Sequence, residues 1–148
     1  MQSLKKIILF LLVCSSLFSQ SFYTLDNVKS LSLYMPNKVG FMDKKQKDNL
    51  KKSVIKRLKD AGFVFGETDA TTIMIKIESI SVEDTQVIHV QLGLGEEVLT
   101  SRPGKIHTFA LTYLETDFID SDEPILDTIE SVNFLLSEFL EAYKDDNE

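Results

Sequence analysis

The residues best suited to chemistry in this chain are two histidines, and their spacing favours no catalytic or metal centre. His89 and His107 fall in two neighbouring strands that the sequence predicts, joined by a turn at residues 100–105. A hairpin closed at that turn places His107 beside the turn and His89 far along the strand, so the pair cannot share a metal ion. Both are interpreted as surface histidines of strands.

A second group that could do chemistry is an acidic cluster before the last helix of the chain. It consists of Asp117, Asp120, Asp122 and Glu123. Clustered oxygens suit calcium, but the EF-hand spacing and its glycine are missing, and helix-start carboxylates explain the same residues. No HExxH, CxxC, GxSxG or P-loop pattern occurs, and the "LGLGEE" stretch at 92–97 opens no helix. We therefore expect no enzyme, no cofactor and no metal.

The N-terminus has the order of a secretory signal peptide. Lys5 and Lys6 precede an apolar run at 7–18, and small residues follow at Ser19 and Ser21. The run is shorter than the roughly 20 residues that a membrane-spanning helix needs. Residues 1–21 are therefore predicted to be a signal peptide, cleaved after Ser19 or Ser21, and the protein to be exported, either periplasmic or secreted.

Cys14, the only cysteine, leaves a second possibility for the N-terminus. The stretch "LLVC" is similar to a bacterial lipobox, in which the cysteine is lipidated, although Val13 stands where a small residue is usual. Lipidation would anchor the protein to the outer membrane. Later cleavage would leave a chain without cysteine, which has no disulfide or thiolate chemistry.

Composition and charge point to one globular domain that does not bind nucleic acid. About 127 residues remain after the signal peptide, which is the size of an ordinary domain. Losing Lys5 and Lys6 changes the formal charge from −7 to −9, and a net acidic chain is a poor partner for nucleic acid. We divide the mature chain into an extension at 22–29, a single domain at 30–143 and an acidic tail at 144–148.

The basic run at 42–59 predicts an amphipathic helix. Asp43 and Gln46 have capping-box spacing, and Gly62 suits the left-handed position past the helix end. One face of this helix is apolar, and the opposite face carries a lysine stripe made of Lys45, Lys52, Lys56 and Lys59. The stripe is either a solvated surface or a weak docking surface for an acidic protein or an anionic lipid face.

A second amphipathic helix is predicted from about Asp122 to Tyr143, with Pro124 in its first turn. Its apolar positions form one continuous stripe, but Phe134 lies on the far side among carboxylates. Phe134 is either a partner contact, or covered by the N-terminal segment near residues 22 and 23, or simply exposed. The sequence leaves these alternatives open.

Four strands are predicted at 30–35, 71–82, 85–99 and 105–119 from their alternating apolar residues. In the second strand the apolar phase shifts after Ile77, which predicts a β-bulge near Ser79. In the last strand Phe109, Leu111 and Tyr113 are expected on one face.

The element order β-α-β-β-β-α predicts an α+β fold, a two-layer sandwich with a mixed four-stranded sheet. Each helix has a single apolar stripe, so both helices are expected to cover the same face of the sheet. The other face would be open and half-polar, carrying Lys76, Glu78, His89 and Gln91.

This order, with a helix, then Ala61-Gly62-Phe63, then a long strand hairpin, resembles the lipopolysaccharide-assembly lipoprotein family. The resemblance covers Ser30 to Tyr143 as topology and includes no specific motif. It implies a small envelope protein that plugs and supports an outer-membrane barrel.

The expected function is therefore that of a non-catalytic, exported cell-envelope module that binds another protein or assists assembly. The expected partner is an envelope protein or an anionic surface, with membrane association only if Cys14 is lipidated. The alternative is a carrier of lipid or another small ligand, with a pocket lined by Phe109, Leu111, Tyr113 and Phe139. A dense core would favour the binding module.

Overall fold

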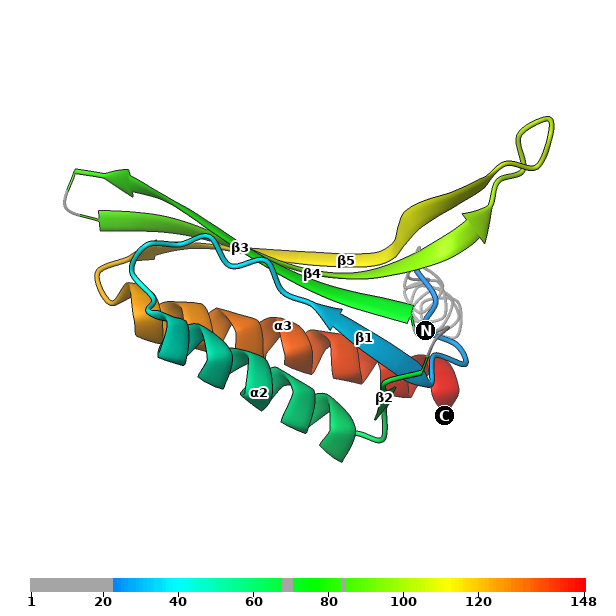
Figure 1. Ribbon diagram of the computed structural model, residues 1–148, viewed down its shortest axis with the longest axis horizontal. Helices are drawn as coiled ribbons and strands as arrows, with labels where there is room; N and C mark the ends of the chain where they lie inside the picture. Colours follow the sequence, from blue (N-terminus) through cyan, green and yellow to red (C-terminus); the bar gives the residue numbers. More distant parts are fainter. Residues whose placement is uncertain (1–22, 68–70, 84) are drawn as a thin grey trace, which may run out of the picture.

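The computed structural model describes residues 23–67, 71–83 and 85–148, so the predicted signal peptide and Cys14 lie outside the described residues. Two helices pack on one side of a single sheet (Figure 1). The elements along the chain are β1 (Ser30–Tyr34), α2 (Lys44–Asp60), β2 (Val64–Phe65), β3 (Thr71–Val82), β4 (Thr85–Leu99), β5 (His107–Ser121) and α3 (Pro124–Asn147).

The sheet is mixed, as predicted, but it has five strands in the order β2-β1-β3-β4-β5, so the prediction of four strands was wrong. β1 runs parallel to both β2 and β3, and the remaining neighbours are antiparallel. The missed strand, β2, has only two residues, too few to show a period-2 pattern. The α+β class and the helical layer on one face of the sheet are confirmed.

Local sequence signals place α2 where it was predicted. The Asp43 side chain accepts from the Gln46 amide at 2.7 Å, and the Gln46 side chain accepts from the Asp43 amide at 2.8 Å. Gly62 follows the helix with a φ of 99°, in the left-handed region. Leu50, Val54 and Leu58 are buried against the sheet layer.

The last helix is longer than its apolar stripe predicts. α3 continues to Asn147, whereas the sequence pattern ended the helix at about Tyr143. The Leu25 amide donates to Asp146 Oδ2 at 2.6 Å, and Asn147 Nδ2 donates to the Leu25 carbonyl at 3.1 Å. Leu25 itself is buried in the core, so contacts remote in sequence hold this polar end of the helix in place.

The predicted bulge near Ser79 was wrong. β3 and β4 pair without interruption from Thr72 opposite Gly95 to Val82 opposite Thr85. The apolar phase changes at Ile80 for another reason: Ile80 and Val82 belong to the face that neither α2 nor α3 covers, and both are exposed.

The irregularity lies instead between β4 and β5. Leu94 pairs with Tyr113 and Gly95 pairs with Leu111, so Thr112 is an extra residue on β5. A bulge of one residue reverses the facing of every side chain beyond it. Tyr113 is buried under the helices, while Phe109 and Leu111 are exposed on the opposite side. The prediction that these three share a face was therefore wrong.

Candidate functional site

The lysine stripe lies on the exposed side of α2. All four of its residues are exposed, and two of them have intramolecular contacts. Lys56 Nζ lies 2.5 Å from Asp60 Oδ2, and Lys59 Nζ lies 5.9 Å from the centre of the Phe65 ring. Exposed pairs of this kind contribute about 0–1 kcal/mol, so these contacts leave the stripe accessible to a partner.

The basic residue that joins the two helices is Arg57, which is not part of the stripe. Its guanidinium donates to the Asn133 carbonyl at 2.7 Å and to Ser137 Oγ at 2.6 Å, both on α3. In the part of the chain that the structure describes, no ion pair within 4 Å connects α2 to α3. The opposite net charges of the two helices are therefore not matched by direct pairs.

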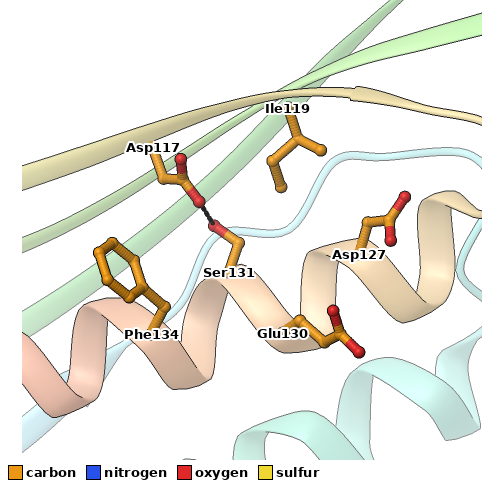
Figure 2. Close-up of a pocket in the computed structure, with 6 residues that line it drawn as sticks. All are labelled: Asp117, Ile119, Asp127, Glu130, Ser131 and Phe134. Atoms are coloured by element: carbon orange, nitrogen blue, oxygen red, sulfur yellow. Dashed lines mark hydrogen bonds between the residues drawn. The ribbon is translucent and has the colours of Figure 1, made fainter.

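Phe134 lies on α3 beside a shallow pocket of about 230 Å³ (Figure 2). Its side chain is 54% exposed. The pocket is lined by Asp117, Ile119, Asp127, Glu130, Ser131 and Phe134. Tyr23 packs on Tyr113 with the ring centres 5.8 Å apart, and Phe22 lies outside the described residues.

Two of the pocket carboxylates attach α3 to β5. Ser131 Oγ donates to Asp117 Oδ2 at 2.7 Å (Figure 2), and Ser121 Oγ donates to Asp127 Oδ2. Asp120 pairs with Val87 and faces the open side of the sheet, whereas Asp117 faces α3. The acidic cluster predicted from the sequence is therefore divided between the two faces. Within the described ranges, no group of three or more His, Cys, Asp or Glu residues could hold a metal ion.

The centre of the open sheet face is polar, as the sequence indicated. Lys76 Nζ lies 2.7 Å from Glu78 Oε2, and this hydrogen-bonded ammonium lowers the pKa of the Glu78 carboxyl. His89 is half-buried and stacks on Phe118, with ring centres 4.0 Å apart and planes 4° apart. His107 pairs with Leu99, so ten positions along β4 separate the two histidines.

Around this polar centre the open face is more apolar than predicted. Tyr34 is 58% exposed, Ile80 65% and Phe118 69%, and Val82 is exposed beside Ile80. Ile80 and Val82 continue the alternation of β3 that contains Lys76 and Glu78. Counting every second residue along β3 from Lys76 could therefore have placed both on the open face. We call Tyr34, Ile80, Val82 and Phe118 the open-face apolar residues.

At one end of the sheet β4 and β5 extend beyond all other strands as a two-stranded arm, which we define as residues 96–111 (Figure 1). The last β3 pairing is that of Thr72 with Gly95, so within the described residues no third strand pairs with the arm. Its exposed apolar side chains are Leu99, Ile106, Phe109 and Leu111.

The pocket expected of a carrier is not formed. Phe109 and Leu111 lie on the face of the sheet opposite Tyr113 and Phe139, so these four side chains cannot line one cavity. Tyr113 and Phe139 pack directly on each other with ring centres 5.4 Å apart. Two further surface pockets, of about 310 and 330 Å³, lie at the C-terminal and N-terminal ends of α3.

No protein-family model matches the sequence, and no curated protein matches it significantly. Neither of the helices in the described residues combines the length and the apolar character needed to cross a bilayer.

Proposed function

We propose that the protein is a non-catalytic, exported cell-envelope module that binds another protein through the open face of its sheet. The observation that carries this proposal is the exposure of the open-face apolar residues. They lie on the face of the sheet that neither α2 nor α3 covers (Figure 1). Large apolar groups gathered on one surface are typical of interaction sites.

The energetic gain from covering this face is substantial. Burying one exposed Val, Ile or Phe side chain contributes roughly 1.5–3 kcal/mol. Ile80 and Phe118 are each more than half exposed, so a partner that covers both gains an apolar anchor of the kind that dominates protein interfaces. The Lys76–Glu78 pair beside them supplies polar contacts that orient the partner.

The lysine stripe is a second, weaker docking surface in this proposal. Its four exposed ammonium groups fit an acidic protein or an anionic surface, and their attraction would act mainly on the rate of encounter. Phe134 gives the α3 side of the molecule one further exposed apolar contact.

The binding module is favoured over the carrier because the space between sheet and helices is filled. Ile73, Ile75 and Ile77 of β3 are fully buried there, as are Leu58 of α2 and Leu136 of α3. An envelope-assembly role is also what the resemblance to the lipopolysaccharide-assembly lipoprotein family implies.

In-cell crosslinking followed by mass spectrometry tests the open face directly. The double variant Ile80→Ser/Phe118→Ser should lose the crosslinked protein partner, while Leu126→Ser, an exposed apolar residue on α3, should retain it. If the double variant recovers the same partner as the parent, the open face is not the binding site.

Export has a separate test. Sequencing of the mature N-terminus should show cleavage after Ser19 or Ser21. A lipid-modified Cys14 as first residue would instead place the protein on a membrane by an acyl anchor.

A further inference from the structure

The tip of the arm combines exposed apolar side chains with basic ones. Leu99 is 52% exposed and Ile106 53% exposed, and they flank a loop that contains Arg102 and Lys105. We infer that this tip inserts into the interfacial layer of an anionic phospholipid bilayer. The inference goes beyond the proposed function, because it uses a different surface and requires no lipidated cysteine.

The charge at the tip complements an anionic bilayer although the whole protein is acidic. No Asp or Glu occurs between Val98 and Thr108, whereas the whole chain has a formal charge of −7. The five residues from Gly95 to Leu99 span about 13 Å as a strand. Charge effects decay over about 8 Å at physiological ionic strength. The carboxylates of the body beyond Gly95 are therefore largely screened from a bilayer that touches the tip. Of the carboxylates of the arm itself, the exposed Glu97 lies nearest, about 7 Å along the strand from Leu99.

Three backbone amides of the tip, those of Thr100, Lys105 and Ile106, are already hydrogen-bonded within the loop. The Thr100 amide donates to the Ile106 carbonyl at 3.0 Å, and the Ile106 amide donates to Thr100 Oγ1 at 3.2 Å. The Lys105 amide donates to the Arg102 carbonyl at 3.0 Å. Satisfied backbone groups lower the cost of leaving water, which is the main obstacle to placing a loop in an apolar layer.

The arm also holds the tip away from the rest of the molecule. The two-stranded arm projects from the sheet (Figure 1). The exposed side chains of Phe109 and Leu111 lie on β5 between the tip and the rest of the sheet. Two apolar side chains and two cations give weak, reversible binding, comparable in kind to that of a single acyl chain. A protein partner at the same tip would need no anionic lipid, which separates the two alternatives experimentally.

The absence of tryptophan from the chain allows a local reporter. We would express the full chain with Cys14→Ser, to exclude acylation, and place one tryptophan either at the tip, Ile106→Trp, or on α3, Phe134→Trp. Vesicles of phosphatidylglycerol and phosphatidylcholine should shift the Ile106→Trp emission to the blue and leave the Phe134→Trp emission unchanged. Vesicles of phosphatidylcholine alone should have a much smaller effect.

The basic residues are tested by sedimentation with the same vesicles. Arg102→Gln/Lys105→Gln should weaken binding to the anionic vesicles about tenfold, since each Lys or Arg near an anionic surface strengthens membrane binding. Lys38→Gln/Lys144→Gln removes equal charge outside both the tip and the lysine stripe and should have little effect. An Ile106→Trp emission that anionic vesicles do not change would overturn the inference. The inference would also be overturned if the Ile106→Trp emission shifted to the blue only when a protein partner is added. The open-face proposal would not be affected by that result.

Discussion

The two faces of the same sheet differ in what they contact. On the helix-covered face, Ile75 of β3 and Leu92 of β4 are fully buried, whereas Ile80 of β3 and Phe118 of β5 are exposed on the other face. Both faces carry large apolar side chains, so hydrophobicity alone does not distinguish the core from the surface. The difference is that two amphipathic helices supply apolar stripes for only one face.

β5 shows how narrowly the two faces are separated. Tyr113 and Leu111 are two residues apart and would share a face in a regular strand. The extra residue Thr112 places them on opposite faces, one in the core and one in solvent. One residue of register thus moves apolar surface from the core to solvent.

The largest expected difference between the faces is in stability. Leu58→Ala and Leu136→Ala each remove a fully buried side chain and should lower the free energy of unfolding by about 2–5 kcal/mol. Ile80→Ala on the open face should cost less than about 1 kcal/mol. Urea unfolding measures all three. A loss below about 0.5 kcal/mol at Leu58 or Leu136 would contradict the assignment of the covered face.

A smaller change in the free energy of unfolding is expected at Gly95, which lies beside the bulge. A Cβ added at Gly95 would lie 2.2 Å from a carbon of the Phe109 ring, so Gly95→Ala must displace that ring and should cost about 1 kcal/mol. In a Phe109→Ala background the cost should disappear. Gly40→Ala is the control, since nothing lies within 4 Å of its added Cβ. Equal costs of Gly95→Ala in both backgrounds would show that the contact is not the cause.

A third effect should appear only in alkaline solution. Burial, followed by the nearby carboxylates of Glu115 and Glu138, raises the pKa of Tyr113 above its usual value. A raised pKa in the folded state means that Tyr113 supports folding below pH about 10, the pKa of an unfolded tyrosine, and that this support is lost as the pH rises further.

Tyr113→Phe should therefore reduce the loss of stability between about pH 10 and pH 11, measured by urea unfolding at each pH. Tyr34→Phe, on the open face, is the matched control. Identical alkaline profiles for the parent and Tyr113→Phe would mean that Tyr113 is not buried as the structure has it.

The smallest effect is expected on the outer side of the helix layer. Changing Lys45, Lys52, Lys56 and Lys59 together to Gln should alter the free energy of unfolding by less than about 1 kcal/mol, because exposed charges contribute little. The same variant should weaken any partner recovered by crosslinking, with a smaller difference at high salt. If every partner is retained at low salt, the stripe is only a solvated surface.

Signals that act within a few residues were readable from the sequence. The capping box of Asp43 and Gln46 and the left-handed Gly62 set the ends of α2, because they depend only on near neighbours. The alternation of Ile73, Ile75 and Ile77 identified a covered strand face for the same reason. The polar centre of the open face followed from that alternation.

Features that depend on pairing between distant segments were decided by the tertiary structure. β2 is a strand only because β1 lies beside it, and α3 reaches Asn147 because Leu25 supplies hydrogen bonds to its end. The bulge at Thr112 depends on the register of β5 against β4, which no local pattern specifies. The sequence by itself thus determined which segments are amphipathic. Only the packed structure decided which apolar residues are buried and which are exposed, because burial depends on the element that lies opposite.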